Sequence, residues 1–285
     1  MASIIGCVMT SHVPAIGNAI AKGRQAEPYW KEWFDGFKPV HRWLATAKPD
    51  VAVVVYNDHG LNFFLDKLPT FAIGAATEYK TADEGWNIPT VLPFTGDPAM
   101  SWHVINSVVA EDFDVTMCQE MVVDHAVCNP MQLLWPGGDP WPVRIVPVEI
   151  NTVQFPLPSA ARCYRLGQAI GRAIASYPAD ARVLVIGTGG LSHQLDGERA
   201  GFINKEFDAA FMASLTADPS WVTRYSTLEL VERTGSQGIE LILWLTARAA
   251  LGAGSGVSGV HEVAATYHVP ISNTAAGMML LEPTG

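Results

Sequence analysis

The chain has 285 residues, of which 49% are hydrophobic and 16% are charged, and its formal net charge is −10. This composition excludes a disordered chain, and an acidic balance without any cluster of Lys or Arg excludes a nucleic-acid-binding surface. The sequence has no apolar run long enough to cross a bilayer and no basic leader at its start, so we expect a cytoplasmic protein. The four cysteines form no CxxC pair, which argues against a thiolate metal site.

Three short apolar segments rich in β-branched residues predict strands that are buried on both faces of a parallel sheet. They are residues 3–9, 51–55 and 182–187. Each segment runs into a loop that carries a histidine, namely His12, His59 and His193. Because ligands of open α/β sheets bind outside the carboxyl ends of the strands, we expect these histidines to converge at one sheet edge.

The rest of the chain mixes helical and extended patterns. Helices are predicted at 27–47 (with a break near Gly36 and Pro39), 98–110, 159–176, 204–215 and 241–250. Further strands are predicted at 71–74, 113–118, 143–150 (interrupted by Pro147) and within 264–281, with a long loop over 75–97. This order predicts one α/β domain over 1–285, with a central, mostly parallel or mixed sheet flanked by helices and an active site at the carboxyl ends of the strands.

Four histidines are expected in loops: His12, His59, His125 and His193. Singly, each is more often structural, but several imidazoles at one sheet edge favour a metal centre with an acid/base histidine nearby. Imidazoles with one carboxylate suit Fe(II), Mn(II) or Zn(II), and Glu240 falls in the first turn of a predicted helix. The absence of HExxH lowers the case for a zinc hydrolase. Spacing alone leaves both an Fe(II) oxygenase and a zinc hydrolase open.

Six motifs, in this order along the chain, resemble those of the LigB-type extradiol ring-cleavage dioxygenases. They are Thr10-Ser11-His12-Val13-Pro14, Tyr56-Asn57-Asp58-His59, Asp83-Glu84-Gly85-Trp86, Val123-Asp124-His125, the segment from Gly187 to His193, and the segment from Gly235 to Leu241. The resemblance extends to Ser272-Asn273-Thr274, nearly the whole chain. Within the family, the chain is most similar to the large β subunit of the protocatechuate 4,5-dioxygenase type.

The resemblance implies a role for each predicted site residue. Fe(II) would be held by His12, His59 and Glu240, with O₂ as co-substrate. His193 would be the acid/base residue, and His125 would line the pocket and take part in catalysis. The ring substituents of the substrate would contact a third set of residues: Asn57, Ser272 and Asn273.

The implied reaction is cleavage of protocatechuate to 4-carboxy-2-hydroxymuconate semialdehyde, with gallate or 3-O-methylgallate as alternative substrates. A zinc hydrolase and a non-catalytic binding protein on the same fold are the competing interpretations. Ala126 stands where close relatives are expected to have glycine, which affects the pocket. The chain ends at Gly285 without the extension expected of single-chain gallate enzymes. A separate small α subunit in an α₂β₂-like assembly is therefore expected, or else a homodimer.

Overall fold

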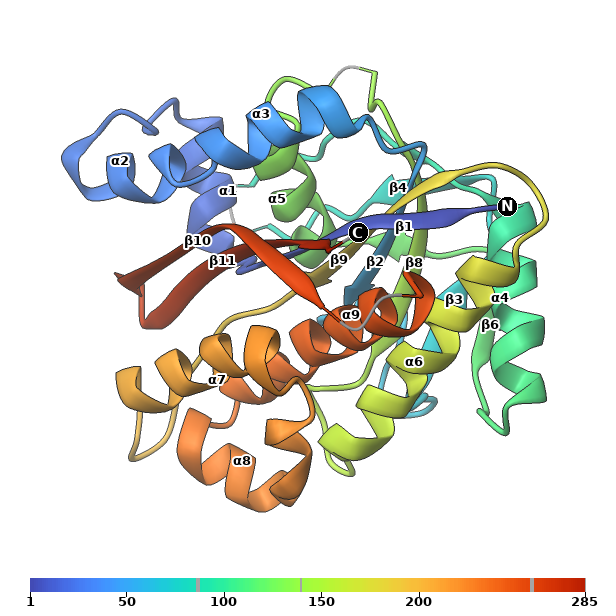
Figure 1. Ribbon diagram of the computed structural model, residues 1–285. Helices are drawn as coiled ribbons and strands as arrows, with labels where there is room; N and C mark the ends of the chain where they lie inside the picture. Colours follow the sequence, from blue (N-terminus) through green and yellow to red (C-terminus); the bar gives the residue numbers. More distant parts are fainter. Residues whose placement is uncertain (86–87, 139, 257–258, 285) are drawn as a thin grey trace.

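A mixed eight-stranded sheet forms the centre of the molecule (Figure 1). The computed structural model describes residues 1–85, 88–138, 140–256 and 259–284. The strand order is β10 (Val260–Ile271), β11 (Thr274–Pro283), β1 (Ser3–Thr10), β9 (Arg182–Thr188), β2 (Val51–Tyr56), β8 (Arg144–Ile150), β3 (Phe71–Gly74) and β6 (Thr116–Cys118). The four central strands, β1, β9, β2 and β8, are parallel, as the apolar segments predict. The α/β class with a largely parallel central sheet is confirmed.

Helices cover both faces of this sheet (Figure 1). One face carries α1 (Pro14–Ala21), α2 (Pro28–Asp35), α3 (Lys38–Ala47) and α5 (His125–Leu134). The other carries α4 (Pro98–Ala110), α6 (Ala160–Ser176), α7 (Lys205–Ala217), α8 (Thr227–Thr234) and α9 (Leu241–Gly254). Two short 3₁₀ turns, η1 (Trp221–Arg224) and η2 (Gly238–Glu240), link helices on this second face.

Strand β2 shows why the sheet is buried on both sides. Val51, Val53 and Val55 pack into the core on the α6 and α9 face, whereas Ala52 and Val54 pack into the core on the α3 and α5 face. All are inaccessible to solvent. Because each fully buried valine contributes about 1.5–3 kcal/mol, this strand anchors both layers and fixes where its loop emerges.

Several elements differ from the sequence prediction. The break near Gly36 separates α2 from α3 as expected, but β8 runs through Pro147 without interruption, since that residue pairs with Val54 of the parallel neighbour. The loop at 75–97 contains β4 (Glu78–Thr81) and β5 (Phe94–Thr95), which form a small sheet with β7 (Val122–Val123). The expected last strand of the C-terminal segment is β11, and β10, which the sequence did not predict, pairs with it in an antiparallel hairpin.

No helix in the described ranges is long and apolar enough to cross a membrane. Of the residues in the predicted motifs, Trp86 lies outside the described part of the chain.

Candidate metal centre

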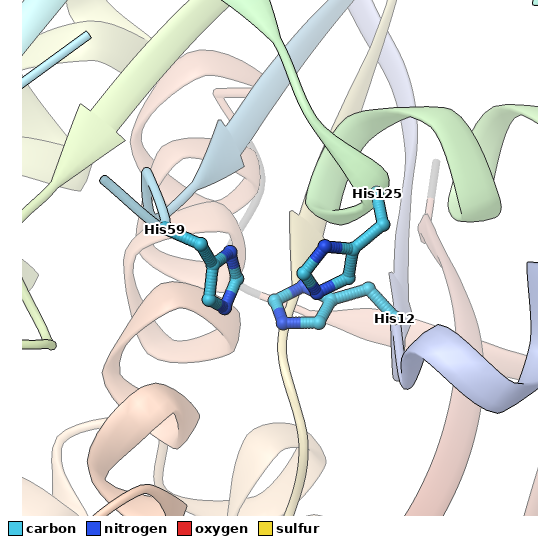
Figure 2. A group of neighbouring side chains, drawn as sticks. All are labelled: His12, His59 and His125. Carbon is cyan, nitrogen blue, oxygen red and sulfur yellow. The ribbon is translucent and has the colours of Figure 1, made fainter. Parts of the chain in front are cut away.

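Three imidazoles meet where the parallel strands end. His12 follows β1, His59 follows β2 and His125 opens α5, and one nitrogen from each lies within 4.8 Å of the others. The ring centroid of His12 is 5.3 Å from those of His59 and His125, which are 4.2 Å from each other. Figure 2 shows the three side chains converging from separate elements. They form a candidate metal-binding group.

The predicted carboxylate also reaches this point. Glu240 ends η2, immediately before α9, and is 6% exposed. Its Oε2 lies 3.5 Å from Nε2 of His12, and its Oε1 lies 3.9 Å from Nε2 of His59. Burial raises the pKa of this carboxyl, but the charge of His12 and the other nearby histidines outweighs burial and holds the pKa well below its ordinary value. Glu240 is therefore an anionic oxygen donor facing two imidazoles.

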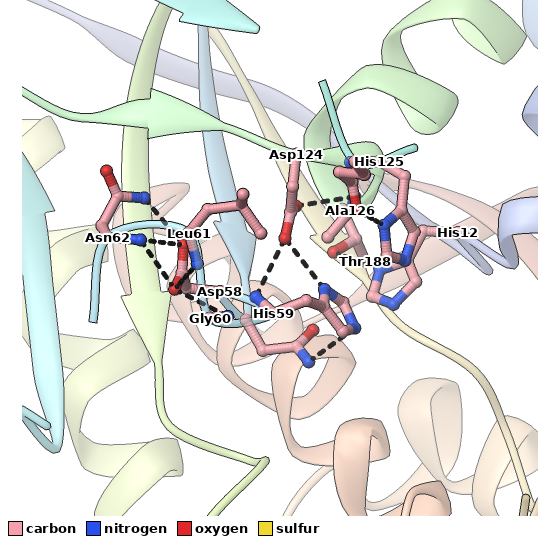
Figure 3. Close-up of polar contacts among 12 residues, drawn as sticks. His12, Asp58, His59, Gly60, Leu61, Asn62, Asp124, His125, Ala126 and Thr188 are labelled. Atoms are coloured by element: carbon pink, nitrogen blue, oxygen red, sulfur yellow. Dashed lines mark hydrogen bonds and ion pairs between the residues drawn. The ribbon is translucent and has the colours of Figure 1, made fainter. Parts of the chain in front are cut away.

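Contacts outside the centre orient the rings of His12 and His59. Nδ1 of His12 is 3.1 Å from the hydroxyl of Thr188. Nδ1 and the backbone N–H of His59 both donate to Oδ2 of Asp124 at 2.9 Å (Figure 3). Burial lowers the pKa of His59, but Asp124 more than offsets burial and raises it to about 9. Since Nδ1 is engaged in each ring, the nitrogen that faces Glu240 is Nε2.

The position of His125 corrects one prediction. The sequence predicted a loop, but His125 is the first residue of α5, and Asp124 caps that helix by accepting from the N–H of Ala126 at 2.9 Å (Figure 3). An Asp before an apolar segment is a helix-start signal, which Pro130 inside the same helix obscures. The cap places His125 rigidly beside His59.

Glu84 holds His125 from behind. Its Oε1 accepts from the backbone N–H of His125 at 2.7 Å, and its Oε2 accepts from Nδ1 at 2.6 Å. Both side chains are buried, with exposed fractions of 5% for His125 and 6% for Glu84. Burial lowers the pKa of His125, and the charge of His59 lowers it further against the effect of Glu84. The bidentate contact directs Nε2 of His125 away from Glu84.

His193 lies in the loop after β9, held at both backbone groups. Its N–H donates to the carbonyl of Thr234 at 2.7 Å, and its carbonyl accepts from the N–H of Gly238 at 3.1 Å. Its Nδ1 donates to the carbonyl of Leu191 at 2.9 Å, and His193 lines the pocket, so Nε2 is the ring nitrogen left for other contacts. A Cβ on Gly235, where φ is +88°, would lie 2.1 Å from the His193 carbonyl oxygen, so this approach requires glycine.

The three predicted substrate contacts occupy different places. Asn57 is fully buried, and its Nδ2 donates to Oε1 of Glu240 at 3.2 Å and lies 3.3 Å from Nε2 of His59. Ser272 is exposed, has a φ of +55° and lines the pocket. Asn273 is exposed in the turn between β10 and β11. Asn57 thus contacts two candidate ligands directly.

A pocket of about 1110 Å³ opens over these groups. Its lining includes His12, His59, His125, His193 and Glu240. The separations of 3.5 and 3.9 Å from Glu240 to the imidazole nitrogens are too long for good hydrogen bonds, yet they bring one carboxylate and two imidazoles together. Two imidazoles and one carboxylate are a donor set that fits Fe(II), with positions left for further ligands.

Sequence reasoning gave no role to the groups that orient the imidazoles, namely Thr188, Asp124 and Glu84. All three residues stand in the six motifs that resemble the family, so their place in those motifs is the signal that the sequence offers. Only the fold shows that each one contacts a histidine.

Comparison of the sequence with known proteins identifies relatives of this chain. Residues 6–277 match a family described as the catalytic LigB subunit of aromatic ring-opening dioxygenase. A gallate dioxygenase of Pseudomonas putida is 42% identical over 201 residues, which are 70% of this chain and 57% of the relative. A 2,3-dihydroxyphenylpropionate/2,3-dihydroxicinnamic acid 1,2-dioxygenase of Rhodococcus sp is 30% identical over 285 residues, covering 85% of this chain and 87% of that protein.

One solved structure shares the fold. An uncharacterized protein of Escherichia coli K12 superposes with a TM-score of 0.55 at 13% identity, covering 97% of this chain and 99% of that protein. The chain spans a little more than half, 57%, of the length of the Pseudomonas gallate dioxygenase.

Proposed function

Because the chain belongs to the family of catalytic LigB subunits of aromatic ring-opening dioxygenases, we propose that it performs Fe(II)-dependent extradiol cleavage of a catecholic acid. The observation that carries the proposal is the approach of Glu240 to Nε2 of both His12 and His59 at 3.5 and 3.9 Å. These three residues would hold the iron. Bound there, Fe(II) would supply a redox-active centre through which electron density could pass from the catechol ring to O₂.

The protein's own part in this reaction is proton transfer and orientation. With its Nδ1–H donated to Leu191, His193 presents an Nε2 that can accept a phenolic proton and later return it. His125, fixed by Glu84, presents its Nε2 to a substrate hydroxyl or to an oxygen that carries developing charge. We assign acid/base catalysis to His193 and substrate binding with oxygen stabilisation to His125.

Among catecholic acids, we propose gallate ahead of protocatechuate. The support is the 42% identity to a gallate dioxygenase over 70% of the chain, which favours what the sequence resemblance gave as an alternative. Arg24 and Ser272 line the pocket and offer a positive charge and a hydroxyl for the substrate carboxylate. Asn57 would act mainly by holding Glu240 rather than by touching the ring.

Anaerobic reconstitution with Fe(II), followed by oxygen uptake on gallate, protocatechuate and 2,3-dihydroxyphenylpropionate, tests this function. We expect uptake with a ring-opened, visibly absorbing product and the highest kcat/KM on gallate. Faster turnover of protocatechuate would restore the substrate that the sequence resemblance favoured. No uptake on any catechol with iron bound would reject the dioxygenase. Hydrolytic activity with Zn(II) would then support a hydrolase, and failure to bind metal would support a binding protein.

We also propose that a second polypeptide covers the pocket mouth. Val153, Phe155 and Leu195 line the pocket, yet they are 56%, 51% and 54% exposed. Exposed apolar side chains gathered around an active site are typical of a surface that another protein covers. The occupant is either a small α subunit, as in an α₂β₂ assembly, or a second copy of this chain. Light scattering of the chain, alone and mixed with a candidate small subunit, distinguishes them. Two expectations stay predictions: that residues 1–285 form one catalytic domain, and that the protein is cytoplasmic.

A further inference from the structure

One buried carboxylate behind the His193 loop has no part in the contacts described above. Asp208 lies in the first turns of α7 and is 1% exposed. Its Oδ1 accepts from the backbone N–H of Ser192 at 2.9 Å, and its Oδ2 accepts from the hydroxyl of Ser192 at 2.6 Å. Both donors of the residue directly before His193 are therefore bound to a single carboxylate.

Two other segments complete this cluster. Tyr267 of β10 donates its hydroxyl to Oδ2 of Asp208 at 2.8 Å. The backbone N–H of Asn204, which caps α7, donates to the hydroxyl oxygen of Ser192 at 2.7 Å. Burial raises the pKa of Asp208, and the donors on Ser192 and Tyr267 oppose that shift. The cluster joins the loop after β9 to α7 and β10 through two buried hydrogen bonds between Ser192 and Asp208 and two partly buried ones from Tyr267 and Asn204.

Ser192 stands between the two residues that set the direction of the imidazole. The ring of His193 is oriented by its Nδ1–H on the carbonyl of Leu191, two residues earlier. That carbonyl and the Cα of His193 keep their geometry only if the peptide units through Ser192 stay fixed. Asp208 is bound to this middle residue, and it is not among the residues that line the pocket.

Resting on the proposed function, we propose that Asp208 is a positioning residue for His193. Its carboxylate fixes Ser192 so that His193 keeps its Nδ1–H on Leu191 and its Nε2 toward the substrate. Tyr267 supports the same carboxylate from β10. Loosening this cluster should misdirect the base and lower kcat, while the three metal ligands, which come from other segments of the chain, keep their affinity for Fe(II).

A double-mutant cycle between Asp208→Asn and His193→Gln tests the proposal. We expect Asp208→Asn to lower kcat by about ten- to a hundredfold, as misplacement of a catalytic group does. KM should change by no more than about twofold, since substrate binding is retained. In the His193→Gln background, Asp208→Asn should lower the residual rate no further. An equal loss in both backgrounds would indicate a general structural role and overturn the proposal.

A second readout does not depend on turnover. In protein labelled with ¹⁵N-histidine, the signal lost in His193→Gln reports the tautomer of His193. We expect the Nδ1–H tautomer in the unmodified chain and a shifted or mixed signal in Asp208→Asn. An unchanged signal would refute the positioning role even if no substrate were turned over. A changed signal in a protein that cleaves no catechol would count against the proposed function alone.

Two further variants separate a loss of positioning from a general loss of folding. Tyr267→Phe keeps the carboxylate and removes one of its donors, so a smaller effect of the same kind is expected on kcat and on the His193 signal. Asp97→Asn is the matched control, because Asp97 is also a buried carboxylate, caps α4 and does not line the pocket. The control should leave both readouts unchanged. A loss of kcat in Asp97→Asn equal to that in Asp208→Asn would overturn the proposal.

Discussion

Replacement of Asp124 by Asn tests how the orientation of His59 affects metal binding, because it leaves the His59 side chain itself unchanged. Oδ2 of Asp124 accepts two hydrogen bonds from His59, and Oδ1 accepts the N–H of Ala126 (Figure 3). The Asn side chain has only one oxygen, so it can accept either from His59 or from the N–H of Ala126. If its oxygen faces His59, the helix cap is lost, which costs about 1 kcal/mol of stability. If its NH₂ faces His59, Nδ1 must become the acceptor and the proton moves to Nε2, where the metal would bind.

The second outcome removes the acceptor that orients His59, and the first replaces a charged acceptor by a neutral amide oxygen, which makes His59 a weaker ligand. Loss of an outer partner of a ligating histidine lowers metal affinity about 10- to 100-fold, equivalent to about 1.4–2.8 kcal/mol. We therefore expect the dissociation constant of Asp124→Asn for Fe(II) to rise by that factor. Anaerobic titration in competition with a coloured chelator measures it, and urea unfolding of the metal-free protein measures the stability lost with the cap.

Asp97→Asn is the control here as well. Asp97 caps α4 by accepting from the N–H of Met100 at 3.0 Å and pairs with Arg144 at 3.1 Å, so its loss lowers stability without touching a histidine. The affinity of the Asp97→Asn variant for Fe(II) should equal that of the unmodified chain. If Asp124→Asn binds Fe(II) as tightly as this control, the carboxylate does not orient His59 for metal binding.

Three further predictions follow from the same geometry. His12→Ala and Glu240→Ala should each lose at least about a hundredfold in Fe(II) affinity; stoichiometric iron after anaerobic reconstitution would reject the ligand assignment. His193→Gln should retain iron but lose about 10²- to 10⁴-fold in kcat, measured by oxygen uptake; a rate near that of the unmodified chain would remove it from catalysis. Glu149 is 1% exposed, and burial, with Asp58 and Asp124 nearby, raises its pKa well above the ordinary value. Since its folded pKa exceeds the unfolded one, its contribution is fully present below about pH 4.3 and is lost as pH rises, by up to about 1.4 kcal/mol per pH unit. Glu149→Gln should therefore gain stability relative to the unmodified chain from pH 5 to pH 8 in urea unfolding, and a constant difference would contradict this.

Local patterns were sufficient to predict the elements that build the floor of the site. β1, β2 and β9 are apolar and β-branched because both faces of the sheet are covered, and this property is visible in each segment alone. Helix α4 begins where Asp97 and Pro98 signal it, and α6 begins after Ser159. The loops that carry His12, His59 and His193 could be placed at one sheet edge because parallel strands end together.

Other features depend on contacts between segments that are distant in sequence. Nothing local to Glu84 indicates that its carboxylate holds His125, because the contact spans 41 residues and is made by the tertiary fold. The apolar segment after Thr274 predicts β11, whereas β10 is only partly buried and lacks a clear period, so no local pattern predicts it. Composition and periodicity report how a segment meets water, and they determined the sheet and its histidine loops. Pairing of remote polar groups depends on relative placement, so only the tertiary structure decided which carboxylate orients each imidazole.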